Sequence, residues 1–117
     1  MNILIYPKCT TCKKAIKWLK DNNVEAKVRH IVEEPLSVEE IRDLHLQSGE
    51  PIKKFFNTSG MKYRELNLKD KLTNMSDEEC YHLLASDGML VKRPLAYNNE
   101  SVTVGFKEAT YETTWKK

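Results

Sequence analysis

Two cysteines at close spacing follow a short apolar run at the start of the chain. Cys9 and Cys12 stand between residues 2–6, which predict a buried strand, and residues 13–22, whose apolar spacing predicts a helix. A thiol at a helix N-terminus meets the positive end of the helix dipole and free backbone N–H groups, and both favour the thiolate. The thiolate attacks disulfides, and a nearby second cysteine can resolve the mixed disulfide. The pattern predicts Cys9 as nucleophile and Cys12 as resolving cysteine.

Two other roles remain open for this cysteine pair. The thiols could simply pack in the core, or they could bind zinc together with Cys80 and His82. The single residue between Cys80 and His82 is not a usual zinc spacing, and Cys80 lies on the apolar side of a predicted helix. We therefore expect Cys80 to be an inert core side chain. We expect His30, His45 and His82 to be surface or hydrogen-bonded core residues, and no metal or organic cofactor to be needed.

Length and composition narrow the class of protein. The 117 residues carry a formal net charge of +2, with 40% hydrophobic and 31% charged residues, which predicts one domain spanning residues 1–117. Lysines and arginines are spread along the chain, so direct nucleic-acid binding is not expected. The N-terminal apolar run is too short for a signal peptide, and no segment is long enough to span a membrane. We expect a cytoplasmic protein, where a close cysteine pair is more often reactive than structural.

The order of the predicted elements indicates the fold. A strand at residues 2–6, a helix at 13–22 and a second strand at 24–32 form a βαβ unit. Shorter helical pieces are predicted at residues 51–66 and 67–74, a hairpin at 89–106, and a final helix at 108–115. This order predicts an α/β fold of the thioredoxin-like (glutaredoxin-like) type, with an all-helical insertion at about residues 36–88.

Two helices of that insertion carry the same start signal. Ser37 is followed three residues later by Glu40, and Ser76 by Glu79, which is the capping-box pattern. Each helical pattern runs toward a glycine, Gly49 in the first case and Gly88 in the second. Both glycines are therefore predicted to end helices.

Three stretches together resemble the arsenate reductase (ArsC) family, which includes the Spx and MgsR regulators. They are IYPKCTTCKKA at residues 5–15, NTSGMKYREL at 57–66 and GMLVKRPL at 88–95. The resemblance implies a thioredoxin-like domain with a helical insertion and a catalytic cysteine at the place of Cys9. It also implies that Pro94 follows a cis peptide bond and that Arg93 faces the cysteine pair. Lys8, Thr10, Thr11 and Pro94 are then expected to support the site.

The family's arginines bind an oxyanion, and Arg93 matches one of them. A second arginine would be expected at the start of residues 57–60, and a third after the last strand, where the chain has Gly105, Phe106 and Lys107. Neither arginine is present. Because a doubly charged oxyanion needs several fixed donors, we expect arsenate reduction to be weak or absent.

Two functions fit these residues. The first is a thiol-disulfide oxidoreductase or redox sensor with Cys9, Cys12 and Arg93 at its centre, and a thiol-containing protein or a low-molecular-weight thiol as electron donor. The alternative is an Spx-like transcription regulator that binds RNA polymerase and uses the pair as a redox-active disulfide switch. Gly49 stands about where Spx has a glycine at its polymerase contact, although a plain helix C-cap explains it equally.

Overall fold

The computed structural model describes residues 1–116 and contains one four-stranded sheet. Strand β1 lies at the centre beside β2 and β3, and β4 forms one edge, in the order β2-β1-β3-β4. β1 and β2 are parallel, whereas β3 is antiparallel to both β1 and β4. The strands are β1 (Asn2–Ile5), β2 (Lys27–His30), β3 (Leu95–Tyr97) and β4 (Val102–Val104).

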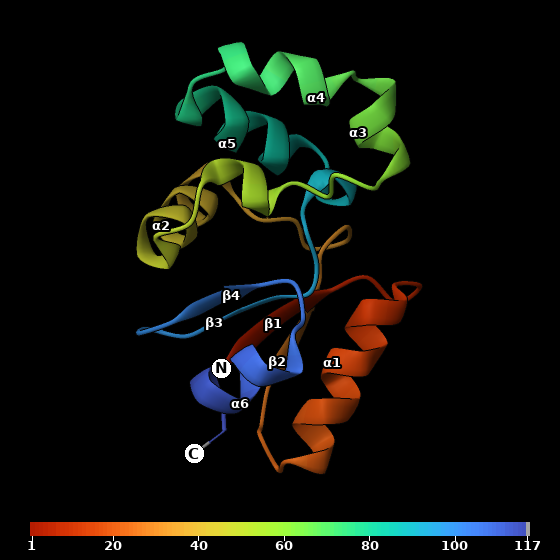
Figure 1. Ribbon diagram of the computed structural model, residues 1–117, viewed down its shortest axis with the longest axis vertical. Helices are drawn as coiled ribbons and strands as arrows, with labels where there is room; N and C mark the ends of the chain where they lie inside the picture. The colour runs from red at the N-terminus through yellow and green to blue at the C-terminus, as the bar shows by residue number, and fades with distance from the viewer. Residues whose placement is uncertain (117) are drawn as a thin grey trace.

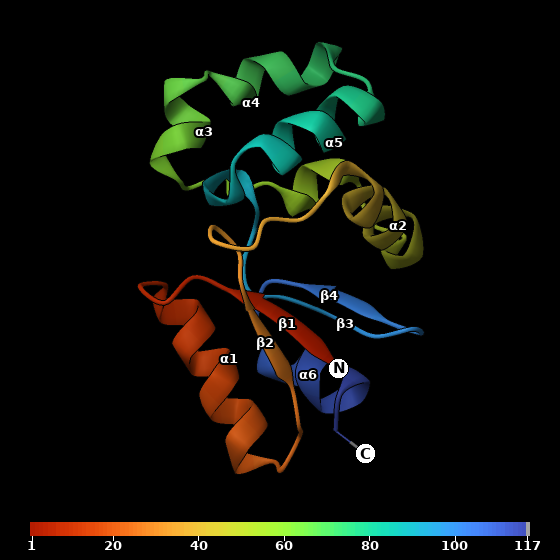
Figure 2. The same cartoon turned by 180° about the vertical axis from the view of Figure 1, so that it is seen from behind.

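Helices cover both faces of this sheet (Figures 1 and 2). α1 (Thr10–Asp21) and α6 (Glu108–Thr114) lie on one face. The other face is covered by a helical insertion, which is the chain between β2 and β3. Its elements are α2 (Val38–Ser48), the 3-10 helix η1 (Ile52–Phe55), α3 (Met61–Glu65), α4 (Leu68–Lys71), η2 (Leu72–Asn74), α5 (Asp77–Ser86) and η3 (Gly88–Leu90).

Successive side chains of each strand point to opposite faces of the sheet, and this divides the core into two clusters. Ile3 and its cross-strand partner Ala96 face α1 and α6, where Trp18, Tyr111 and Trp115 pack. The neighbouring residues of β1 and β3 point the other way, because successive side chains of a strand lie on opposite faces. Leu4 and Leu95 accordingly pack against the helical insertion. The thioredoxin-like α/β class with an all-helical insertion is confirmed, whereas the division into one domain with an insertion at residues 36–88 stays a prediction.

The predicted helix starts are confirmed, but one predicted helix end is wrong. Ser37 and Ser76 both cap their helices in full capping boxes, and Gly49 ends α2 in the left-handed conformation with a φ of 69°. Gly88 does not cap α5, which ends at Ser86. Gly88 instead packs against the chain just after β2, and a Cβ atom on Gly88 would lie 2.2 Å from the carbonyl oxygen of Ile31. Glycine is needed at this position for close approach of two backbones.

No helix within residues 1–116 has both the length and the apolar character that a membrane span requires.

Candidate functional site

Cys9 is the N-cap residue of α1. Its backbone is extended, with φ −84° and ψ 118°, and its sulfur accepts a hydrogen bond from the backbone N–H of Cys12 at 3.4 Å. The Cys9 N–H in turn donates to the carbonyl of Tyr6 at 2.9 Å, which fixes the turn between β1 and α1. Cys9 is half-buried, whereas Cys12 is only 1% exposed, and both thiols are free. A reagent can therefore reach Cys9 before Cys12.

The two thiols have opposite acidities. Partial burial opposes ionisation of Cys9, but hydrogen bonds from the Cys12 side chain and backbone, the charge of Arg93 and the Thr11 N–H outweigh burial, so the pKa of Cys9 is lowered. Burial and, to a smaller extent, the neighbouring Cys9 together raise the pKa of Cys12 to about 12. The site thus holds one thiol that ionises readily and one that stays protonated until it reacts.

Arg93 brings a permanent positive charge to this site. The Arg93–Pro94 peptide bond is cis, as the resemblance implied. Nη1 of Arg93 donates to the carbonyls of Met89 (3.2 Å) and Val91 (3.3 Å), which holds the guanidinium in place. Its Nε is buried and has no hydrogen-bond partner within residues 1–116. A buried donor without a partner is costly to leave unmet, and an anion at the site would satisfy it.

Tyr6 and His30 form a second layer around Arg93 that sequence reasoning missed. The guanidinium carbon of Arg93 lies 5.1 Å from the centre of the Tyr6 ring, and the edge of His30 packs against Tyr6 at 5.9 Å between ring centroids. Nδ1 of His30 accepts hydrogen bonds from the backbone N–H groups of Val32 and Glu33, both at 3.1 Å. His30 is thus a hydrogen-bonded structural residue, as expected. In the sequence, only the position of Tyr6 next to the cysteine motif could have indicated that it belongs to the site.

The other supporting residues predicted from the sequence are placed at the site's margin. Thr10 and Thr11 form the exposed first turn of α1, and the Thr11 backbone N–H is one of the groups that lower the Cys9 pKa. Lys8 is exposed, and its side chain makes no hydrogen bond within residues 1–116. Pro94 is fully buried at the start of β3.

The residues considered as zinc ligands, Cys9, Cys12, Cys80 and His82, do not form a metal site among residues 1–116. Within residues 1–116, the structure contains no group of three or more His, Cys, Asp or Glu side chains that could hold a metal ion. Cys80 is 1% exposed in the core between the sheet and the helical insertion, and burial raises its pKa. The prediction that Cys80 packs as a small core side chain is therefore confirmed. His82 is exposed, and the His45 ring is hydrogen-bonded to the hydroxyl of Tyr81.

An apolar groove lies beside the cysteine pair. It has a volume of about 410 Å³ and brings Tyr6, Pro7 and Ile16 next to Cys12. A groove of this kind can hold an apolar side chain.

The sheet, the helical insertion, the thiol pair at the start of α1 and the cis-proline just before β3 define a thioredoxin-like protein. The sequence model of the ArsC family matches residues 4–114. The chain therefore belongs to the ArsC family.

Similar proteins agree with this assignment. The chain is 60% identical over 110 residues to the uncharacterized protein YusI of Bacillus subtilis (strain 168), covering 94% of this chain and 93% of YusI. It is 30% identical over 101 residues to the regulatory protein MgsR of the same organism, covering 86% and 79% of the two chains. Among solved structures, an ArsC family related protein from Bacteroides fragilis superposes with a TM-score of 0.93 at 50% identity, covering 96% of this chain and 94% of the other.

Proposed function

We propose that the protein is a thiol-disulfide redox protein in which Cys9 attacks and Cys12 resolves. The observation that carries this proposal is the pairing of a half-buried thiol of lowered pKa at the N-cap of α1 with a buried thiol of raised pKa three residues later. The thiolate is the reactive form in exchange, so the difference in acidity sets the order of the two steps.

In the first step the Cys9 thiolate attacks one sulfur of a partner disulfide. The partner's S–S bond breaks, a mixed disulfide forms at Cys9, and the leaving sulfur departs as a thiolate that takes up a proton from solvent. Cys12 then attacks the Cys9 sulfur, and its proton passes to the partner's second sulfur. The partner gains two electrons and two protons, and the protein is left with a Cys9–Cys12 disulfide. A thiol-containing protein or a low-molecular-weight thiol reverses this oxidation.

Arg93 has a supporting role in this cycle. Its charge stabilises the Cys9 thiolate, and its unpartnered Nε can meet negative charge on the leaving sulfur. Because Arg93 stands alone where the family's oxyanion site has further arginines, arsenate reduction is expected to be weak. Turnover comparable to a dedicated arsenate reductase in a coupled thiol assay would contradict that expectation.

Trapping of the mixed disulfide tests the proposal directly. Cys12→Ser blocks the resolving step, so partners attacked by Cys9 stay covalently attached and can be identified by mass spectrometry. Cys9→Ser/Cys12→Ser is the matched control and should trap nothing. Attachment through Cys80, or equal trapping by the control, would overturn the assignment. In the parent, mild diamide should join Cys9 to Cys12 and leave Cys80 reduced.

A second function is favoured by the similarity to the regulatory protein MgsR. In that case the same pair switches a binding surface, and the partner proposed is RNA polymerase. Purified polymerase should then bind the oxidised and reduced forms with different affinity, and Cys9→Ser/Cys12→Ser should remove the difference. Equal binding of the oxidised and reduced forms would contradict the regulatory function and leave the thiol-disulfide function unaffected.

A further inference from the structure

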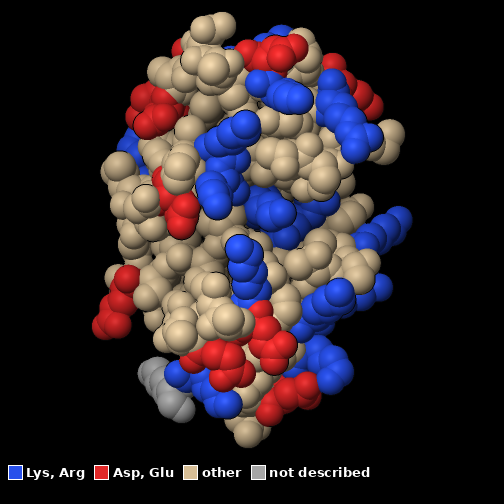
Figure 3. All heavy atoms as spheres, viewed as in Figure 1, with Lys and Arg blue, Asp and Glu red and all other residues tan. Residues whose placement is uncertain are grey.

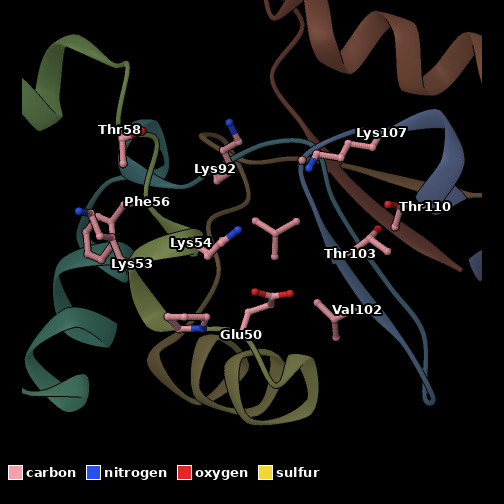
Figure 4. A pocket seen from close by; sticks show the side chains of 13 residues that line it. Glu50, Lys53, Lys54, Phe56, Thr58, Lys92, Val102, Thr103, Lys107 and Thr110 are labelled. Atoms are coloured by element: carbon pink, nitrogen blue, oxygen red, sulfur yellow. The ribbon is translucent and has the colours of Figure 1, made fainter.

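A second hollow lies away from the apolar groove, between β4 and the helical insertion. Its volume is about 580 Å³, and Phe56 of the insertion and Val102 of β4 lie on opposite sides of it (Figure 4). Pro51 and Val104 also line it. This volume is typical of a ligand pocket. We call it the β4 cleft.

The β4 cleft is positively charged. Lys53, Lys54, Lys92 and Lys107 line it, against the single carboxylate of Glu50. None of these five side chains forms an ion pair within residues 1–116. Lys54 and Lys107 reach into the cleft from opposite walls (Figure 4), and basic side chains gather across the middle of this face of the molecule (Figure 3). A ligand here would meet unneutralised positive charge from both sides.

The floor of the β4 cleft is the free edge of the sheet. Within residues 1–116, β4 pairs with β3 on one side and with no strand on the other. The Gly105 N–H donates to the Pro94 carbonyl at 2.9 Å, and the Ser101 carbonyl accepts from the Asn98 N–H at 3.0 Å, so residues 101 and 105 bond toward β3.

Alternation of an antiparallel ladder then fixes where the remaining backbone groups of β4 point. The N–H and C=O groups of Val102 and Val104 lie in non-hydrogen-bonded positions opposite Tyr97 and Leu95, and they point away from β3. Both residues line the cleft. These groups form a row of donors and acceptors at the spacing of an extended chain.

We propose that the β4 cleft binds an acidic segment of a partner protein, which adds to β4 as a further strand. The backbone of the segment bonds to the edge of β4, its carboxylates meet Lys54, Lys92 and Lys107, and its apolar side chains contact Pro51 and the valines of β4. This mode of recognition uses backbone bonds for affinity and side chains for specificity. Binding needs neither cysteine, so this site goes beyond the proposed redox function.

Other occupants fit the observations less well. A second copy of this chain pairing through β4 would bring the same lysines against one another. Single-stranded nucleic acid also carries negative charge, but it binds by stacking its bases on exposed aromatic rings. Phe56 is the aromatic residue in the lining and is only 1% exposed. A small anion could meet the lysines but would leave the edge of β4 unpaired.

The probe for this site is a fluorescent hexapeptide of alternating Glu and Val. It should bind the full chain, and Cys9→Ser/Cys12→Ser should bind it equally well, which separates this test from that of the redox function. Lys54→Glu/Lys107→Glu should weaken binding about tenfold or more, because attraction across the cleft becomes repulsion. Lys69→Glu/Lys71→Glu makes the same change of charge at two exposed positions of α4 and should alter affinity by less than about twofold.

A second peptide tests strand addition separately from charge. The same hexapeptide with alternate backbone nitrogens methylated keeps every carboxylate but cannot pair with a strand edge, and should bind at least about tenfold more weakly. In nitrogen–proton NMR spectra the parent peptide should shift the Val102 and Val104 amide signals and slow their hydrogen exchange.

Three results would overturn the proposal: equal binding of the methylated peptide, full competition by inorganic pyrophosphate or an oligothymidylate without shifts at Val102 and Val104, or no binding of the parent peptide.

Discussion

Three helices of this protein begin with the same hydrogen bond and yet differ in what their N-termini can do. Ser37 accepts from the N–H of Glu40 at 3.1 Å, and Ser76 accepts from the N–H of Glu79 at 3.2 Å. At α1 the sulfur of Cys9 takes the place of the serine oxygen and accepts from the N–H of Cys12.

The difference lies in the residue that completes the cap. At α2 and α5 a glutamate carboxylate returns to the N-cap backbone, and further acidic residues fill the first turn. The first turn of α1 contains no acidic residue. The partial positive charge of a helix start is therefore already neutralised at α2 and α5, whereas at α1 it remains available to a thiolate. The Cys9 thiolate is therefore the negative charge that interacts with the partial positive charge at the N-terminus of α1.

The largest expected effect comes from making α1 resemble the other two helices. Cys9→Ser keeps a good N-cap residue, so the free energy of unfolding should change by less than about 1 kcal/mol. Disulfide exchange should nevertheless be lost, because serine does not form the attacking thiolate. Urea unfolding and a disulfide-reduction assay measure the two outcomes.

Cys80→Ala is the matched control for this first variant. It should retain exchange activity while lowering the free energy of unfolding by about 1 kcal/mol, since Cys80 is packed in the core. Loss of disulfide exchange in Cys80→Ala, or its retention in Cys9→Ser, would mean that Cys80 and not Cys9 is the reactive thiol.

A smaller effect is expected when the charge beside Cys9 is removed. Arg93→Ala should raise the pKa of Cys9 and slow its alkylation by iodoacetamide at neutral pH by about threefold to tenfold. Arg93→Lys keeps the charge and should retain part of the rate. Arg64→Ala, at an exposed position of α3, is the control and should leave the rate unchanged. An unaltered thiolate titration in Arg93→Ala would show that Arg93 is a solvated cation with no role in the chemistry.

The third prediction restores to α1 the acidic first turn found in α2 and α5. Thr10→Glu places a carboxylate at the exposed start of the helix, where it competes with the Cys9 thiolate for the dipole. The pKa of Cys9 should rise, and alkylation should slow by about twofold to fivefold. Thr10→Gln has the same size without the charge and should react like the parent. If both variants slow equally, the effect is steric and the comparison between helices fails.

The smallest expected effect is a dependence of stability on pH. The ordinary pKa of a cysteine thiol is near 9.0, and that of Cys9 is lowered in the folded protein. Ionised Cys9 therefore stabilises the folded state, fully above about pH 9 and progressively less as pH falls through its lowered pKa. Cys12, with its pKa raised to about 12, lowers stability only above about pH 9.

Unfolding of the parent and of Cys9→Ser can be compared in urea from about pH 6 to about pH 9. The difference in unfolding free energy, parent minus variant, should increase with pH. A difference in unfolding free energy that stays constant or falls with pH would mean that the Cys9 thiolate does not stabilise the folded state.

Features governed by local sequence could be predicted well. The two capping boxes, the left-handed Gly49 and the strand-cysteine-helix order depend on residues within one or two helical turns, and the structure contains all of them. The predicted helix after the cysteines began at residue 13, whereas α1 begins at Thr10. That difference is what makes Cys9 the N-cap residue itself.

Features governed by distant contacts could not be predicted. Gly88 has the spacing of a helix C-cap, but its position is set by the Ile31 carbonyl, which no local pattern reveals. The stacking of Tyr6 on Arg93 and the opening of the β4 cleft beside an edge strand likewise depend on segments that meet only in the folded chain. Arg93 itself was found through family resemblance and not through its neighbours in sequence.

The close approach of Gly88 to Ile31 also bears on how the fold tolerates change in length. Ile31 directly follows β2, where the chain leaves the sheet, and Gly88 precedes the return to β3, so the two ends of the helical insertion meet at this contact. The insertion is thus a closed loop, and the entropy lost on closing a loop grows only with the logarithm of its length. Adding or removing a few residues between α3 and α4 would change that entropy by well under about 0.6 kcal/mol, the amount for a doubling. The insertion can therefore vary in length while the thiol site keeps its geometry.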